Sequence, residues 1–232
     1  MIVGVDDRGK EALTEDPFIQ SAIGTGWAVC GVDPRGIGEL AVERIRWAAA
    51  ASLLLNENFV WRQAWDLGCA VQSLQEALSL HDVGAGASKP CILYGRGDNA
   101  ALAVTYALAQ KPGRQASQPR AYILRDGFLS FRQFVDRPES MALSYRLRPD
   151  TNDPYTSYDH EIPYQYFVFD VLRRLDLPQL LSSVEAQGLV VNPLDGDWKQ
   201  MSEPAARKFL PPTIRLACET HPEETMLHFL GG

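Results

Sequence analysis

The sequence predicts an α/β protein, with a largely parallel sheet of about six strands and helices on both faces. Short apolar runs alternate along the chain with longer stretches in which apolar residues recur at every third or fourth position, and this alternation is typical of strand–helix–strand units. The chain has 232 residues, of which 46% are hydrophobic, and this length supports one sizeable core. We therefore expect a single domain over residues 1–232.

The expected strands are short and apolar, as buried parallel strands are. In chain order they lie at 2–5 (IVGV), 27–32 (WAVCGV), 91–94 (CILY), 121–124 (AYIL), 188–192 (GLVVN) and 213–218 (TIRLAC). Helices are expected between them, at 10–23, 58–78, 100–108, 167–181 and 222–230. The clearest helix is 58–78, because its apolar residues recur at helical spacing, namely Val60, Ala64, Leu67, Val71, Leu74 and Leu78.

The remaining segments are predicted to be irregular. Residues 84–88 and 111–120 read as loops because they are small or polar. Residues 132–166 are rich in Pro, Asp, Tyr and Arg and predict an excursion over the sheet. The aromatic residues of this region and just beyond could line a ligand pocket or pack the loop onto the body; they are Tyr155, Tyr158, Tyr164, Tyr166, Phe167 and Phe169.

Composition limits the possible partners. A formal net charge of −7 argues against nucleic acid, because phosphate binding needs a basic face. No apolar run reaches the roughly 20 residues of a membrane span, and no basic leader precedes the first strand, which favours a cytoplasmic protein unless the chain is a piece of a longer one. The four cysteines are far apart, mostly within apolar segments, and are predicted to be buried free thiols.

The stretch CILYGRGDNAALAVTYALA, residues 91–109, predicts a buried strand, a tight glycine turn and a helix. Two kinds of site share this local shape. One is the G-x-S-x-G nucleophile elbow, which fits only if the serine has become Gly97. The other is the dinucleotide turn G-x-G-x-x-G/A, which Gly95, Gly97 and Ala100 match.

A second motif favours the nucleophile elbow. TGWAVCGVDPRGIGEL, residues 25–40, resembles the strand and turn G-y-x-V-x-x-x-D-x-R-G-x-G-x-S of the α/β-hydrolases, a sharp turn shaped by glycines and by local Asp–Arg pairing. In that superfamily the catalytic acid and then the histidine follow the elbow. Asp195, or else Asp197, stands at the acid's place after the 188–192 strand, and His221 stands after the last strand.

The whole chain therefore resembles an α/β-hydrolase, with the acetyl xylan esterase and dienelactone-hydrolase-like group as the nearest subtype, including paired-domain versions in large bacterial esterases. The resemblance implies ester or acetyl-ester substrates, a Ser-His-Asp mechanism and no cofactor. No His or Cys has metal-ligand spacing to another, so no metal is expected.

Three departures weigh against ordinary catalysis. Gly97 leaves the nucleophile position without a hydroxyl or thiol. The loop after the first strand is Asp6-Asp7-Arg8-Gly9-Lys10 rather than His-Gly-Gly-like, and its carboxylates would repel an oxyanion unless Arg8 and Lys10 neutralise them. The superfamily's first two strands are missing, which predicts an exposed sheet edge and a homodimer or a partner hydrolase domain.

The leading hypothesis is an esterase-like domain without conventional activity, acting as a structural or regulatory module. One alternative is residual ester hydrolysis in which Asp195 orients His221 as a general base, with Asp98 as a displaced nucleophile although its register is wrong by one; a serine from elsewhere, such as Ser130, is a further candidate. The other alternative is nucleotide or small-molecule binding at residues 95–100. The simplest interpretation is that residues 95–100 bind nothing and are small only because a sharp strand–helix turn requires small residues.

Overall fold

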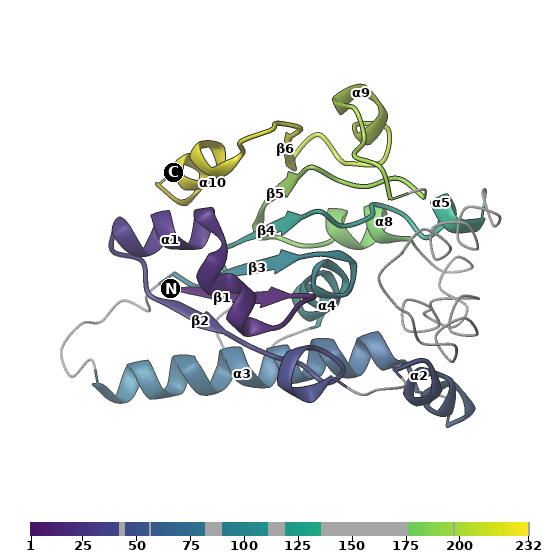
Figure 1. Ribbon diagram of the computed structural model, residues 1–232, viewed down its shortest axis with the longest axis horizontal. Coiled ribbons are helices and arrows are strands. Elements are labelled where there is room, and N and C mark those ends of the chain that lie inside the picture. The colour runs from purple at the N-terminus through teal and green to yellow at the C-terminus, as the bar shows by residue number, and fades with distance from the viewer. Residues whose placement is uncertain are drawn as a thin grey trace, which may run out of the picture.

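The computed structural model describes residues 1–41, 45–55, 57–81, 90–110, 119–135, 176–196 and 198–231. All six predicted strands are present, as β1 (Ile2–Asp6), β2 (Val29–Gly31), β3 (Ile92–Arg96), β4 (Ala121–Arg125), β5 (Gln187–Val191) and β6 (Arg215–Ala217). They form one parallel sheet in the order β2-β1-β3-β4-β5-β6 (Figure 1). The prediction of a six-stranded parallel sheet is confirmed.

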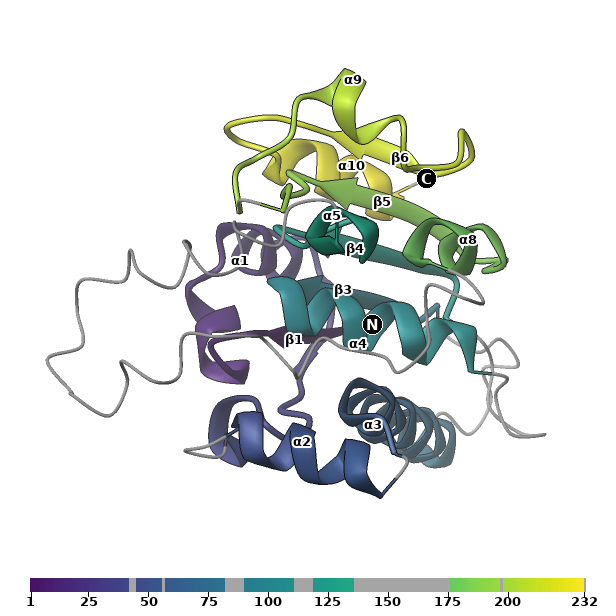
Figure 2. The same ribbon diagram turned by 90° about the vertical axis from the view of Figure 1, so that its right-hand side faces the viewer.

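Helices cover both faces of this sheet (Figure 2). On one face α1 (Pro17–Gly24) and α10 (Glu223–Gly231) pack beside each other over Ile92, Ile123 and Leu189. On the other face α3 (Phe59–His81), α4 (Asp98–Ala109) and α8 (Leu177–Ser182) pack over Leu93, Leu124 and Val190. The remaining described elements are short or peripheral: η1 (Lys10–Glu15), η2 (Gly38–Leu40), α2 (Ile45–Leu54), α5 (Arg132–Val135) and α9 (Glu203–Ala206).

The strand order reverses between β1 and β3. From β1 the chain crosses to β2 on one side and then returns to β3 on the other. In open parallel sheets such a reversal leaves a crevice at the carboxyl ends of the two strands, where ligands usually bind. The segments that follow β1 and β3 are the Asp7 loop and the Gly97 turn, so both lie at this switch point.

Some predicted elements were wrong in detail. The expected helix at 10–23 is interrupted at Asp16, which is the N-cap of α1 and is followed by Pro17 at the first helical position. Proline there fits a helix start and not a helix interior. The helix α2 was not predicted, since its WAAAASLLL run has no clear apolar stripe. Of the predicted 167–181 helix, only the part from Leu177 lies among the described residues.

The spacing of Trp61 and Trp65, one helical turn apart in the sequence, favours a place in the core, but their exposed fractions are 47% and 61%. All four cysteines are free, as predicted, although Cys69 is exposed and only Cys91 is fully buried.

Within the described residues, no helix is both long and apolar enough to cross a membrane. The aromatic residues between 155 and 169 lie outside the described residues.

Candidate functional site: the Asp7–Gly97 corner

The turn between β3 and α4 depends on two glycines. A Cβ on Gly95 would lie 2.8 Å from the carbonyl oxygen of Ala100, so the helix could not come so close to the strand with a larger residue there. Gly97 has φ 94° and ψ 174°, a backbone conformation that is almost restricted to glycine. The strand–turn–helix prediction is therefore correct, and the turn needs small residues for its own geometry.

Asp7 fills the space above this turn. Its carboxylate accepts hydrogen bonds from the backbone N–H groups of Ala100, at 2.7 Å, and Asn99, at 3.1 Å. These amides belong to the first turn of α4, whose N–H groups have no partner within the helix. A Cβ on Gly97 would lie 2.5 Å from Asp7 Cγ. The Asp7 carboxylate thus occupies the place that a side chain at position 97 would need.

The two basic residues of the Asp7 loop do not neutralise it. Arg8 pairs instead with Asp6, at 3.1 Å between Nε and Oδ1, and Lys10 pairs with Glu39, at 2.7 Å. Burial of the Asp7 carboxyl, and next the nearby charge of Asp98, raise its pKa to about 7, although the two backbone hydrogen bonds act in the opposite direction. A developing oxyanion at this corner would therefore meet a carboxyl group and not a cation.

Asp98 is the first residue of α4 and is only 7% exposed. Its Oδ2 accepts a hydrogen bond of 2.6 Å from the indole Nε1–H of Trp198, while its Oδ1 is buried without a hydrogen-bond partner. Burial raises the pKa of Asp98 to about 6, and the bond from Trp198 partly offsets this. A buried carboxyl held on an indole is an acid that can carry a proton near neutral pH.

His221 and Asp195 lie on separate loops. Asp195 lies in a turn where its carboxylate accepts a hydrogen bond from the backbone N–H of Lys199, at 3.0 Å. His221 is exposed and precedes α10. Among the described residues, no hydrogen bond joins the His221 ring to the Asp195 carboxylate, and Asp197 is outside the described residues. Ser130 is buried, and its hydroxyl donates a hydrogen bond to Asp176 at the start of α8.

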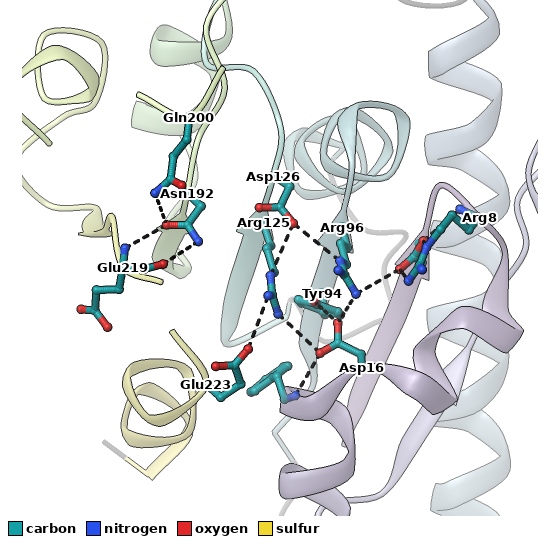
Figure 3. A network of polar contacts seen from close by, with 12 residues as sticks. Arg8, Asp16, Tyr94, Arg96, Arg125, Asp126, Asn192, Gln200, Glu219 and Glu223 are labelled. Carbon is teal, nitrogen blue, oxygen red and sulfur yellow. Dashed lines mark hydrogen bonds and ion pairs between the residues drawn. The ribbon is translucent and has the colours of Figure 1, made fainter. Parts of the chain in front are cut away.

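A residue that sequence reasoning missed joins the ends of β5 and β6. Asn192 accepts hydrogen bonds at Oδ1 from the backbone N–H of Glu219, at 2.9 Å, and from Gln200, at 2.8 Å; its Nδ2 donates to the Glu219 carbonyl at 2.9 Å (Figure 3). Its φ of 47° is left-handed, which asparagine tolerates better than most residues. Asn192 therefore holds the loop that leads to His221.

Replacing Asn192 should show how much its three hydrogen bonds, here called the Asn192 clamp, contribute to the free energy of unfolding. We expect Asn192→Ala to lower the free energy of unfolding by about 3 kcal/mol, because three hydrogen bonds are lost around a buried side chain and alanine strains a left-handed position. Asn192→Gly loses the same bonds without the strain, so it should be about 1 kcal/mol less damaging. Urea unfolding of the two variants measures both quantities. Equal stabilities would refute the backbone contribution, and wild-type stability in both would refute the clamp.

A second missed feature is an arginine network on the α1 side of the corner. The fully buried Asp16 accepts hydrogen bonds from the Tyr94 hydroxyl, at 2.7 Å, and from Arg96, at 3.2 Å, and it pairs with Arg125 at 3.5 Å (Figure 3). Arg125 also pairs with Glu223 of α10 at 3.4 Å. The network joins α1, β3, β4 and α10, so its arginines have carboxylate partners and are not free to bind a ligand.

The hydrogen bonds and ion pairs of the GVDPRG turn after β2 also differ from the prediction. Asp33 accepts hydrogen bonds from the backbone N–H groups of Lys10 and Glu39, at 2.6 and 3.0 Å. Arg35 does not pair with Asp33; it holds Asp66 of α3 through Nε and Nη2, at 2.7 and 2.6 Å. The expected local Asp–Arg pairing was therefore wrong, and the aspartate and arginine connect the turn to two different elements.

Solved structures resemble the chain over 99% of its length. They include DcsB, solved as a complex with its substrate analogue (TM-score 0.54, 18% identity, 89% of that chain), and a lipase-esterase related protein from Clostridium acetobutylicum (0.53, 11%, 92%). VinJ gives a TM-score of 0.52 at 14% identity, over 89% of its chain. The chain has the α/β-hydrolase fold. No protein-family model matches the sequence, and no curated protein matches it significantly.

Gly97 lies in the turn between β3 and α4. The Asp7 loop follows β1, the strand beside it. Within the described part of the chain, no cluster of three or more His, Cys, Asp or Glu residues is arranged to hold a metal ion. The corner offers two carboxyls whose pKa is raised and an indole, and its Asn99 and Ala100 amides are already bonded to Asp7.

Proposed function

We propose that the chain is an esterase-type α/β-hydrolase domain that does not carry out serine-hydrolase chemistry and acts as a structural or regulatory module. The observation that carries this proposal is the Asp7 carboxylate on the Asn99 and Ala100 amides, in the space of a side chain at position 97. Acyl transfer by this mechanism needs a nucleophile and free donors for the oxyanion. Gly97 supplies no nucleophile, and Asp7 occupies donors of the adjoining helix turn.

The nucleotide alternative meets the same obstacle. A phosphate at the N-terminus of α4 would use the first-turn amides, two of which are bonded to Asp7. It would have to displace this carboxylate. The hydrolytic alternative requires His221 to find a carboxylate and a nucleophile. Asp98 directly follows Gly97 in the chain, but its Oδ2 is held by Trp198, so attack would start from the buried Oδ1.

The proposal extends to partners and relatives. We place the chain nearest to the acetyl xylan esterase and dienelactone-hydrolase-like group, with a small ester-like molecule as its candidate ligand. A homodimer or a partner hydrolase domain would suit the domain, since β2 is an edge strand and Trp61 and Trp65 are exposed on α3. A module of this kind would stabilise or regulate the chain it covers.

Hydrolysis of p-nitrophenyl acetate and butyrate tests the proposal. We expect the purified wild-type protein to hydrolyse both esters no faster than a matched protein with no active site, and His221→Ala to behave identically. The Asp98→Asn variant serves as a second control at a buried acid beside the elbow. Wild-type hydrolysis that disappears in His221→Ala would overturn the proposal and favour the hydrolytic alternative, and dependence on Asp98 as well would identify the nucleophile.

A further inference from the structure

Asp7 and Asp98 differ from three other carboxylates at this edge of the sheet. Asp6, Asp16 and Asp126 each pair with one or more arginines, at 3.1 to 3.9 Å. None of the ion pairs formed within the described part of the chain includes Asp7 or Asp98. Two carboxyls flanking Gly97 thus lack a cation, although arginines pair with Asp6, Asp16 and Asp126.

The hydrogen bonds of Asp7 and Asp98 determine which of the two carboxyls can be ionised. Both oxygens of Asp7 accept amide hydrogen bonds, so an ionised Asp7 is stabilised by the first turn of α4. Asp98 has one oxygen on Trp198 and one without a partner, and a buried carboxylate oxygen without a donor strongly favours protonation. Ionising both places two negative charges beside each other at the end of one helix.

The other charged groups near the pair do not relieve this repulsion. Asp6 is the further acid whose charge raises the pKa of Asp7, after burial and Asp98. Around Asp98, the Trp198 indole and the Phe128 backbone amide favour the ionised form, whereas the charge of Asp126 opposes it. The neighbourhood therefore supplies neutral donors and further acids, and the arginines nearby are paired elsewhere.

We propose that Asp7 is a pH-sensitive latch, which holds the loop after β1 on the N-terminus of α4 while the Asp7–Asp98 pair carries a proton and releases it as the pair becomes fully ionised. Release frees the Asn99 and Ala100 amides and the space over Gly97. The latch goes beyond the proposed function and does not depend on it, because it is a property of the contact and not of any reaction.

The direction of the pH effect follows from the pKa of Asp7 in the two states. In the latched state its pKa is about 7, and in a released, solvated loop it returns to the ordinary 3.8. The latched state therefore binds the proton more tightly and is favoured at low pH. Between about pH 4 and pH 7 the ratio of latched to released molecules should fall about tenfold for each pH unit, and it should level off above that range.

Hydrogen exchange of single amides measures the latch. We would follow the Asn99 and Ala100 amides of the intact protein by NMR from pH 4 to 8, with rates corrected for the intrinsic pH dependence of exchange. The Leu93 amide in the centre of β3 serves as the reference for global unfolding. We expect protection of the two α4 amides, relative to Leu93, to fall by about a thousandfold over this range.

Two variants identify the responsible groups. Asp7→Asn keeps the size of the side chain but cannot ionise, so the relative protection should no longer depend on pH. Asp98→Asn removes the repulsion and so lowers the pKa of latched Asp7. The fall should then level off at a pH lower by about one unit or less, because one cause among several is lost. In the wild type the Trp198 indole N–H resonance should titrate near pH 6, and this titration should vanish in Asp98→Asn.

The wild-type pH series alone tests the proposal, so the test does not depend on whether the variants fold. A relative protection of Asn99 and Ala100 that stays constant from pH 4 to 8 would overturn the latch. So would the same pH dependence in a folded Asp7→Asn protein, because another group would then be responsible. Absent ester hydrolysis leaves these measurements unaffected, so failure of the latch and failure of the proposed function are distinguishable.

Discussion

Replacing Gly97 by serine should destabilise the protein severely and should not by itself restore a nucleophile. The new Cβ would lie 2.5 Å from Asp7 Cγ and 2.6 Å from its Oδ2, and serine would have to adopt φ 94°. Backbone strain of this kind costs about 1–3 kcal/mol, and overpacking costs about as much again. We expect Gly97→Ser to lower the free energy of unfolding by about 4 kcal/mol, measured in urea.

The same substitution should be milder when Asp7 is removed. In Asp7→Gly the carboxylate is gone, so Gly97→Ser then faces only the backbone strain. We expect the two changes to be non-additive by about 2 kcal/mol, since residues in contact commonly couple by this amount. Gly24→Ala is a matched control, because no atom lies within 4 Å of its added Cβ. Strict additivity in this double-mutant cycle would contradict the assignment of Asp7 as the group that fills the corner.

This coupling also shows what the sequence could not supply. The strand–turn–helix pattern is local, so the sequence alone could predict the turn and assign the nucleophile's place in it to Gly97. The contact of Asp7 with the space over Gly97 joins residues 90 positions apart, and it depends on how β1 and β3 pair. The loop DDRGK left open whether Arg8 and Lys10 neutralise its two acids. In the structure Arg8 pairs with Asp6 and Lys10 with Glu39, so neither cation pairs with Asp7.

The strands were predictable for a similar reason. Buried parallel strands form apolar runs that are visible in the sequence, and all six occur in the structure. The errors concern polar residues at strand ends. Asp16 followed by Pro17 is a recognisable N-cap and first helical position, so that break could have been read from the sequence. The role of Asn192 could not, because its partners Gln200 and Glu219 are brought together only by the order of β5 and β6.

The pairing of His221 with Asp195 as catalytic histidine and acid is still a prediction that rests on the resemblance alone. Chain order places an acid after β5 and a histidine after β6, and the structure agrees with that order. Pairing needs the two loops to turn toward each other, however, and the Asp195 carboxylate is bonded to its own turn. Position in the chain predicts which loop carries a residue, but hydrogen bonding within the loop decides where the side chain points.

The arginine network should be the main electrostatic support of the fold. Asp16 is fully buried, caps the first turn of α1 at 2.9 Å through the Phe18 amide and holds Tyr94, Arg96 and Arg125. Removing one partner from a buried ion pair leaves an uncompensated charge, which costs about 3–5 kcal/mol. We expect Asp16→Ala to lower the free energy of unfolding by about this amount.

Two further variants separate the contributions of Asp16. Asp16→Asn keeps the side-chain volume and an oxygen that can cap α1, but it loses the charge. Its free energy of unfolding should therefore be about 1 kcal/mol higher than that of Asp16→Ala, which is the contribution of the cap. Glu39→Ala breaks an exposed ion pair with Lys10 and should leave stability unchanged, because such pairs contribute little. Urea unfolding at low and high salt provides the measurement. The Asp16→Ala loss should persist in high salt, since buried pairs are screened weakly, and a loss no larger than that of Glu39→Ala would show that the network does not support the fold.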